Sequence, residues 1–123
     1  MSNAKHTITD SEYSIMKILW NSEKKMTVSD VVRALDGNDW TPSTVSTFLQ
    51  RLLKKNVVSC EKKGNTNLYY PILKQNDYDM SETESFLSKI YKGSVKNLVA
   101  ALYENKKLSK EDMSELKSMF DLD

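Results

Sequence analysis

The fold is decided by the stretch Thr41-Pro42-Ser43-Thr44-Val45-Ser46-Thr47-Phe48-Leu49-Gln50-Arg51-Leu52-Leu53-Lys54-Lys55-Asn56. Thr41 can cap the N–H groups of a first helical turn, and Pro42 fits the first helical position because its missing N–H has no partner there. Lys54 and Lys55 suit the negative end of a helix dipole, and Asn56 can adopt the left-handed conformation that stops a helix. These signals predict a helix over about residues 42–55.

The two faces of this helix differ in chemistry. One face has apolar side chains at helical spacing: Val45, Phe48, Leu49, Leu52 and Leu53. The opposite face has short polar side chains followed by cations: Ser43, Ser46, Thr47 and Gln50, then Arg51 and Lys54. Short polar groups can meet base edges in a DNA major groove while cations reach phosphates. The alternative is the solvated face of an ordinary core helix, and this stretch alone does not separate the two.

Composition places the chain among soluble globular proteins. Its 123 residues suffice for one domain, or one domain with an appendage; 39% are hydrophobic and 28% charged. The sequence contains no apolar run of about 18 residues, and Met1 to Thr7 lack the apolar core of a signal peptide, so we expect a cytoplasmic protein. Since Cys60 is the single cysteine, no intrachain disulfide is expected.

Charge is divided unevenly along the chain. Residues 1–75 hold 11 Lys and Arg against 7 Asp and Glu, whereas residues 76–123 hold 7 against 10. A basic part and an acidic part predict that only the first faces a polyanion. We therefore expect a DNA-binding domain over 1–75 and a second domain over 76–123.

Two shorter helices are predicted before Thr41. Thr9 and Glu12 have capping-box spacing, and Thr27 and Asp30 repeat that spacing before a second apolar pattern. The cluster Asp36-Gly37-Asn38-Asp39 predicts a turn that stops the second helix.

A β-hairpin is predicted after Asn56. Val57 to Lys63 predicts one strand, Gly64 to Asn67 a turn, and Leu68 to Ile72 a second strand, in which Pro71 belongs late or at an edge. The order helix, helix, helix, hairpin is that of a winged helix-turn-helix. In that fold the third helix enters the major groove and the hairpin, or wing, touches the neighbouring backbone or minor groove.

Three more helices are predicted over 76–123. Asp77, Asp79 and Ser81 can each cap the first, Gly93-Ser94 can break the chain before the second, and Ser109 caps the third with Asp112 three residues on. Because so short a segment buries little surface alone, its apolar stripes are expected to pack on the winged helix or on a second copy. We favour a second copy, because proteins that read paired half-sites need a two-fold axis. The expected fold class is mainly α with a small β-hairpin: a winged helix-turn-helix domain followed by a helical dimerisation arm.

Several segments together resemble a known family. They are Ile8 to Trp20; Asp39 to Lys55; the wing with Tyr69-Tyr70-Pro71; Phe86 to Ser94 with Asn97-Leu98-Val99; and Leu108-Ser109 to Leu116. In register over almost the whole chain, they resemble the BlaI/MecI/CopY family of bacterial repressors, the penicillinase-repressor family. The more specific parts are Glu12 to Trp20 and the Trp-x-Pro-x-Thr-x-x-Thr pattern that begins at Trp40.

The resemblance implies a homodimer that binds inverted-repeat operators, often with TACA/TGTA half-sites, and represses β-lactam-resistance-type or related genes. In the β-lactam-responsive branch, a membrane sensor with a zinc protease domain leads to cleavage of the repressor arm. By register that bond falls at Ala101-Leu102, where the best-known members have Asn-Phe. The copper-responsive branch has a C-terminal cysteine cluster, whereas residues 104–123 contain no Cys or His, which argues against metal sensing by that route.

The predicted site residues form three groups, and no cofactor is predicted. Candidates for base contacts are Ser43, Thr44, Ser46, Thr47 and Gln50, although Thr44 can instead point sideways toward the backbone. Candidates for phosphate contacts are Arg51, Lys54, Lys55, Lys62 and Lys63. The dimer interface is predicted at Phe86, Ile90, Tyr91, Leu98, Val99, Leu102, Leu116 and Phe120. The expected partners are double-stranded operator DNA, a second copy of the chain and a membrane sensor-protease system.

Other functions stay open at this point. An enzyme is disfavoured because His6 and Cys60 do not form a plausible pair and no phosphate loop or metal-ligand spacing occurs. A protein-interaction module could use the winged helix as a scaffold without DNA specificity. A regulator of another operon could be constitutive or could bind a ligand among tyrosines, although core packing is their commoner role: Tyr69, Tyr70, Tyr78, Tyr91 and Tyr103.

Overall fold

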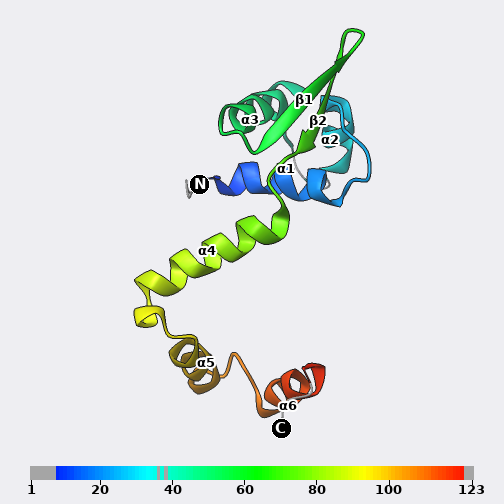
Figure 1. The fold of residues 1–123 in the computed structure, drawn as a ribbon. Helices are drawn as coiled ribbons and strands as arrows, with labels where there is room; N and C mark the ends of the chain where they lie inside the picture. The colour runs from blue at the N-terminus through cyan, green and yellow to red at the C-terminus, as the bar shows by residue number, and fades with distance from the viewer. Residues whose placement is uncertain (1–7, 36, 38, 121–123) are drawn as a thin grey trace. The chain divides into compact units, whose positions relative to one another are not determined.

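The structure, a computed structural model, describes residues 8–35, 37 and 39–120 (Figure 1). The chain divides after Met80 into two compact units. The sequence predictions that concern Met1 to Thr7, Asp36 and Asn38 lie outside the described residues. Within the described part of the chain, no helix is both long enough and apolar enough to cross a membrane.

The first two helices begin at their predicted capping boxes. Before α1 (Asp10–Asn21), Thr9 Oγ1 accepts a hydrogen bond from the Glu12 N–H at 3.1 Å, and Glu12 Oε1 accepts one from the Thr9 N–H at 3.0 Å. Before α2 (Val28–Ala34), Thr27 and Asp30 form the same reciprocal pair at 3.0 Å. Both predictions are confirmed, and each box satisfies two N–H groups that the helix itself leaves unpaired.

The helix predicted over about residues 42–55 is α3 (Pro42–Lys54). Thr41 Oγ1 accepts a hydrogen bond from the Thr44 N–H at 3.2 Å, and Pro42 is the first helical residue. Asn56 has φ 61°, so it takes the left-handed conformation predicted for the stop. Both ends of the helix therefore lie where local chemistry predicted them.

One hydrophobic core holds α1, α2, α3 and the hairpin together. Its buried members are Ile15, Met16, Leu19, Val31, Val45, Leu49, Leu52, Val57, Val58 and Tyr69. The predicted apolar face of α3 points into this core, with Phe48 and Leu53 half-buried at its edge. Because that face is used for packing, the polar face of α3 is left at the surface.

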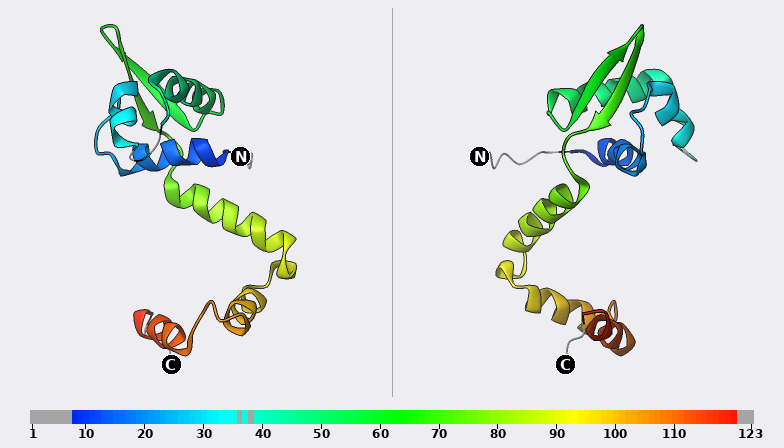
Figure 2. Two further views of the ribbon diagram at one scale, coloured as in Figure 1. Left: turned by 180° about the vertical axis from the view of Figure 1, so that it is seen from behind. Right: turned by 45° about the vertical axis from the view of Figure 1, so that its right-hand side comes forward.

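The hairpin consists of β1 (Val58–Lys63) and β2 (Thr66–Pro71), paired antiparallel from Val58 opposite Pro71 to Lys63 opposite Thr66. It extends past the three helices of its unit (Figure 2). The predicted turn over Gly64 to Asn67 was too long. Gly64 takes φ +64°, which glycine adopts readily, so the chain reverses in two residues and Thr66 and Asn67 join β2.

The start of α4 (Gln75–Lys89) packs on the first unit. Tyr78 is buried, with its ring centroid 5.8 Å from that of Tyr13 and 6.3 Å from that of Trp20. Trp20 Nε1 donates to the Leu73 carbonyl at 2.7 Å. The helix begins before all three proposed caps, Asp77, Asp79 and Ser81. Burial of Tyr78 in its first turn explains this early start, which capping signals alone do not give.

The second unit contains the rest of α4, the short 3-10 helix η1 (Tyr91–Gly93), α5 (Val95–Glu104) and α6 (Lys110–Met119). The predicted break is confirmed: Gly93 has φ +76°, and Ser94 Oγ caps α5 by accepting from the Asn97 N–H at 3.1 Å. Ser109 and Asp112 form the predicted capping box of α6. Tyr103, Leu108 and neighbouring polar residues line an apolar pocket of about 420 Å³ between α5 and α6.

Candidate nucleic-acid interface

The outer face of α3 presents the predicted base-contact residues unequally. Ser43, Thr47 and Gln50 are exposed, whereas Thr44 and Ser46 are half-buried. Thr44 Oγ1 accepts a hydrogen bond from Thr41 Oγ1 at 3.2 Å, which makes it part of the helix cap. The sideways orientation considered for Thr44 therefore describes its position better than the open helix face does.

Two exposed side chains on this face already have partners. Thr47 Oγ1 donates to the Ser43 carbonyl at 3.1 Å, so its hydroxyl keeps acceptor capacity toward the outside. Gln50 Nε2 donates to the phenolic oxygen of Tyr69 at 3.2 Å. Tyr69 belongs to β2, so this hydrogen bond joins the third helix to the wing.

The cations of α3 lie in different environments. Lys54 is exposed, and the Arg51 guanidinium lies over the Phe48 ring, 5.6 Å from its centroid. Such a stacked guanidinium is held in position while its N–H groups can still reach an anion. The Trp40 ring packs against the Phe48 ring, with 5.0 Å between their centroids, and so supports the ring over which Arg51 lies.

Lys55 differs because it forms an ion pair inside the unit. Its Nζ lies 2.5 Å from Oε1 of Glu12, whose side chain is 1% exposed. Burial raises the pKa of Glu12, but the Lys55 ammonium and the Thr9 N–H outweigh burial and hold that pKa below its ordinary value. The phosphate contact expected of Lys55 stays a prediction, and the pair gives this residue a second role in fixing the end of α3 to the start of α1.

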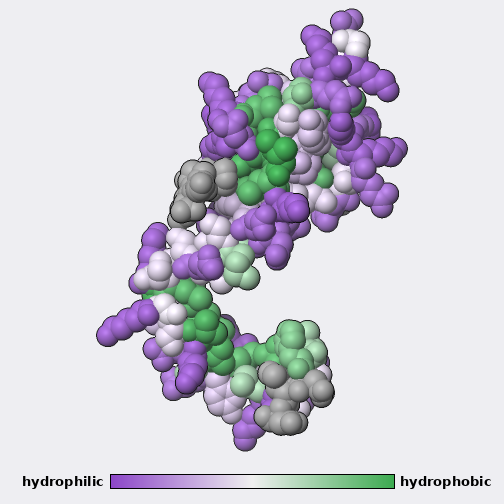
Figure 3. Space-filling view, in the orientation of Figure 1, coloured by the Kyte–Doolittle hydropathy of each residue, from purple (hydrophilic) through white to green (hydrophobic). Residues whose placement is uncertain are grey.

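The wing carries the predicted cations at its tip. Lys62 and Lys63 are exposed, and hydrophilic side chains gather at the end of the hairpin in Figure 3. At its base the Lys25 ammonium forms an ion pair with Glu61 and lies 4.5 Å from the centroid of the Tyr70 ring. The hydrogen bond between them raises the pKa of Lys25 and lowers that of Glu61. Lys25 was missed from the sequence because it belongs to the loop before α2.

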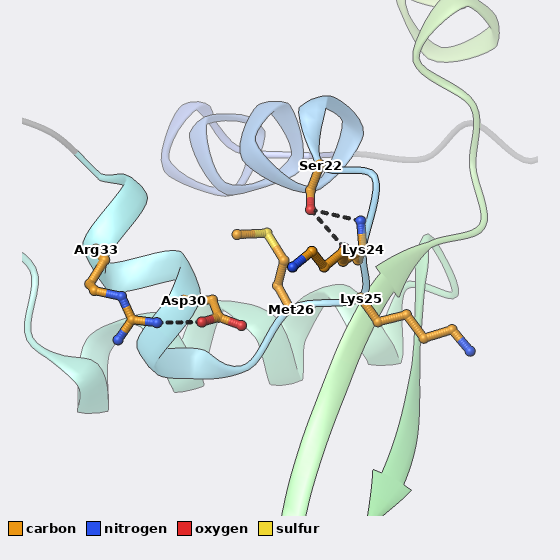
Figure 4. Close-up of a pocket in the computed structure, with 6 residues that line it drawn as sticks. All are labelled: Ser22, Lys24, Lys25, Met26, Asp30 and Arg33. Carbon is orange, nitrogen blue, oxygen red and sulfur yellow. Dashed lines mark hydrogen bonds and ion pairs between the residues drawn. The ribbon is translucent and has the colours of Figure 1, made fainter.

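A small pocket of about 260 Å³ lies beside this loop. Figure 4 shows the residues that line it. Among its lining residues, the Arg33 guanidinium binds the Asp30 carboxylate at 2.5 Å. Ser22 Oγ accepts a hydrogen bond from the Lys24 backbone N–H at 3.1 Å and donates one to the Lys24 carbonyl at 2.7 Å. Hydrogen bonds from Thr27 are the main reason that the pKa of Asp30 is lowered. These contacts brace the turn between α1 and α2, and none of the predicted site residues lines the pocket.

The arm exposes much of its apolar surface. Within its described residues, neither α5 nor α6 contains a buried side chain. Six of the eight predicted interface residues are exposed: Phe86, Ile90, Tyr91, Leu102, Leu116 and Phe120. Leu98 and Val99 are half-buried. Val95, Tyr103 and Met119, which lie outside the predicted interface, are 59%, 41% and 71% exposed.

The expected cleavage position lies inside a helix. Ala101 and Leu102 belong to α5, where the Ala101 carbonyl accepts from the Asn105 N–H at 3.0 Å and the Leu102 carbonyl accepts from the Lys107 N–H at 2.8 Å. Ala101 is half-buried and Leu102 exposed. Since a protease needs extended backbone, α5 must open locally before this bond can be cut.

The fold and the surface of the first unit define a winged helix-turn-helix protein with a polar outer face on its third helix and a basic wing. The family model described as Penicillinase repressor matches residues 8–121. The chain belongs to the penicillinase repressor family, which confirms the resemblance found in the sequence. This family consists of transcriptional repressors rather than enzymes.

Individual relatives agree with this assignment. The penicillinase repressor of Bacillus licheniformis is 33% identical over 110 residues, which cover 89% of this chain and 85% of that protein. The methicillin resistance regulatory protein MecI of Staphylococcus aureus strain N315 is 28% identical over 120 residues, 97% of each chain.

Solved structures support the fold of the first unit. The DNA-binding domain of the repressor BlaI superposes with a TM-score of 0.53 at 29% identity, covering 63% of this chain and 94% of that domain. The monomeric form of Bacillus licheniformis BlaI, solved in complex with the blaP half-operator, gives a TM-score of 0.51 at 30% identity, covering 61% and 92%. The expected winged helix-turn-helix is confirmed.

Proposed function

We propose that this chain is a homodimeric transcriptional repressor that binds inverted-repeat operator DNA in the cytoplasm. The observation that carries the proposal is the outer face of α3, polar at its start and cationic toward its end, in one unit with a basic wing. The monomeric form of Bacillus licheniformis BlaI, which resembles this unit, was solved in complex with the blaP half-operator. A winged helix of this kind inserts its third helix into the major groove.

The two kinds of contact would have separate effects. Ser43, Ser46, Thr47 and Gln50 reach base edges and set the sequence preference, with Thr44 at the cap beside them. Arg51, Lys54, Lys62 and Lys63 neutralise phosphates, so they add affinity that falls as salt rises. Lys55 can join the phosphate contacts only from within its pair with Glu12.

The exposed apolar surface of the arm favours dimerisation. Side chains of the size of Phe86, Phe120 and Met119, which are 46%, 64% and 71% exposed, are unfavourable in water unless another surface covers them. A second copy of the chain supplies that surface and gives the two-fold axis that an inverted repeat requires.

Derepression by proteolysis in the arm is the form of control we propose, with genes of the β-lactam-resistance type as targets. Cleavage at Ala101-Leu102 separates α6 and part of α5 from the rest, which removes apolar side chains from the dimer surface. The bond becomes accessible when α5 opens, so control would act through local unfolding. Intact-mass measurement of the repressor after exposure of the producing cells to a β-lactam tests this step. Two fragments that meet at 101–102 are expected, and an uncut chain during derepression excludes it.

The test of the whole proposal is fluorescence anisotropy with DNA from upstream of the chain's own gene. The intact inverted repeat, one half-site and a scrambled duplex are compared at two salt concentrations. Tight binding to the intact repeat and a large loss on the half-site are expected of a dimeric operator reader. Equal, salt-sensitive binding to all three duplexes contradicts operator recognition, and no binding to any of them favours a protein-interaction module.

A further inference from the structure

We propose that Tyr69 is a positioning residue that orients the Gln50 amide to read an adenine in the operator. The inference rests on the proposed function and adds to it one base identity and the residue pair that reads it. Its starting observation is the 3.2 Å hydrogen bond from Gln50 Nε2 to the Tyr69 phenolic oxygen. The two residues are 19 positions apart and come from α3 and β2.

Tyr69 is held in place by the burial of its ring and by two backbone hydrogen bonds. Its side chain is 2% exposed within the hydrophobic core. Its backbone N–H donates to the Met26 carbonyl at 2.7 Å, and its own carbonyl accepts from the Met26 N–H at 2.9 Å. Since ring and backbone are both held, the phenolic oxygen is a rigid acceptor at the foot of the wing.

Gln50 is the exposed member of the pair. A surface glutamine without such a partner samples many rotamers, and binding DNA then requires it to lose that freedom. Tyr69 removes part of this entropic loss before DNA arrives. The chain therefore presents an amide in a preset orientation on the face that is proposed to enter the groove.

The remaining hydrogen-bonding groups of this amide match adenine. A glutamine amide has two N–H donors and one carbonyl acceptor, and one N–H is taken by Tyr69. The second N–H can donate to adenine N7 while the carbonyl accepts from the adenine N6 amino group. Guanine presents two acceptors, N7 and O6. The same amide would place its carbonyl oxygen next to O6, so two acceptors would face each other and guanine is disfavoured.

The first measurement maps base preference by anisotropy on the upstream inverted repeat, with each base pair of the half-site replaced in turn. For the wild-type chain, one A·T pair changed to G·C is expected to weaken binding roughly 5- to 150-fold. Replacing that adenine by 7-deazaadenine, which lacks the N7 acceptor, should also weaken binding. Gln50→Ala should remove the preference at this pair and leave the other positions unchanged.

The decisive variant is Tyr69→Phe, which removes the phenolic oxygen and keeps the buried ring. It should reduce discrimination at the same A·T pair roughly 2- to 10-fold, with unchanged affinity for scrambled DNA and an unchanged salt slope. In the Gln50→Ala background it should have no further effect on discrimination. The matched control is Tyr70→Phe on the same strand, whose ring lies near Lys25, and it should leave every base preference intact.

A loss of affinity that is equal on operator and scrambled DNA would show that Tyr69 serves only the fold, and this overturns the inference. Unchanged discrimination in Tyr69→Phe overturns it as well. A wild-type chain with no preference for the operator defeats the proposed function and the inference together. That failure is distinguishable because it appears before any substitution is made.

A measurement on the DNA-free wild-type chain covers the case in which Tyr69→Phe does not fold. Side-chain ¹⁵N relaxation of Gln50 should give an order parameter above about 0.6, whereas a lower value describes a mobile amide. A mobile Gln50 amide overturns the inference whatever its affinity for DNA.

Discussion

At the scale of single residues, the outer face of α3 combines groups that interact with the protein and groups available to a ligand. Thr47 is exposed, and its hydroxyl donates its hydrogen bond to the Ser43 carbonyl. Its acceptor lone pairs and its methyl group are what it can offer a base. A substitution there should therefore change recognition without disturbing the core.

Thr47→Ala is expected to weaken operator binding by about 1–3 kcal/mol and to leave scrambled-duplex binding unchanged. Alanine favours helix more than threonine does, so stability should be equal or higher by a few tenths of a kcal/mol. Anisotropy on both duplexes and urea unfolding check these expectations. Thr47→Ser separates the two contacts, because it keeps the hydroxyl and removes the methyl. Equal losses on both duplexes would contradict a base contact.

At the scale of elements, the Glu12–Lys55 pair joins the start of α1 to the end of α3. The pKa of Glu12 is held below its ordinary value of 4.5, because hydrogen bonds from Lys55 and Thr9 outweigh burial. A depressed carboxyl pKa stabilises the folded state fully above about pH 4.5, and that contribution is lost as pH falls further through the folded value.

Glu12→Gln should flatten the loss of stability below pH 4.5, since glutamine keeps the capping acceptor and does not titrate. At pH 7, Lys55→Met should destabilise the first unit by about 1–3 kcal/mol, because it leaves a buried carboxylate without its cation. The effect stays below that of a fully buried pair because the Lys55 side chain is 31% exposed. Urea unfolding at pH 3, 4, 5 and 7 tests both, and parallel pH profiles for wild type and Glu12→Gln would contradict the pair's role.

The wing is the second element with a testable charge balance. Lys62→Ala should weaken binding to operator and scrambled DNA alike and reduce the salt slope by about one. Glu61→Gln should do the opposite, because it releases Lys25 from its ion pair and leaves the hairpin more positive. Anisotropy titrations over several salt concentrations give both slopes. Identical slopes for the two variants would exclude the wing from the phosphate contacts.

At the scale of the whole molecule, the first compact unit extends to Met80, past the basic part expected over 1–75. The reason is Tyr78, which is buried against Tyr13 and Trp20 although it belongs to α4. The Tyr13 hydroxyl adds a 3.0 Å hydrogen bond to Asp79. These contacts place the first six residues of α4 with the winged helix.

A fragment over 1–80 should therefore be more stable than one over 1–75, by about 1.5–3 kcal/mol for burial of one large side chain. Because it lacks the arm that is proposed to form the dimer, the 1–80 fragment should have the same affinity for a single half-site as for each half-site of the intact repeat. Urea unfolding of both fragments checks the stability, with Tyr78→Ala in the longer fragment as the control, and anisotropy on the half-site and the intact repeat checks the binding. Equal stability of the two fragments would assign the start of α4 to the arm.

The sequence by itself determined the elements and most of their ends. Capping boxes at Thr9, Thr27 and Ser109, the proline at the start of α3 and the left-handed Asn56 are local signals, because each depends on residues within one helical turn. The apolar face of α3 followed from its 3.6-residue period. That periodicity also left the polar face as the candidate recognition surface.

The tertiary structure decided what depends on contacts between distant segments. The partners of Lys55, Lys25 and Gln50 lie 43, 36 and 19 residues away, and no local pattern encodes such pairings. Packing likewise set the start of α4 through Tyr78, and strand pairing shortened the hairpin turn to two residues. Local propensity fixes where a helix can begin, whereas burial and long-range hydrogen bonds fix which side chains stay available at the surface.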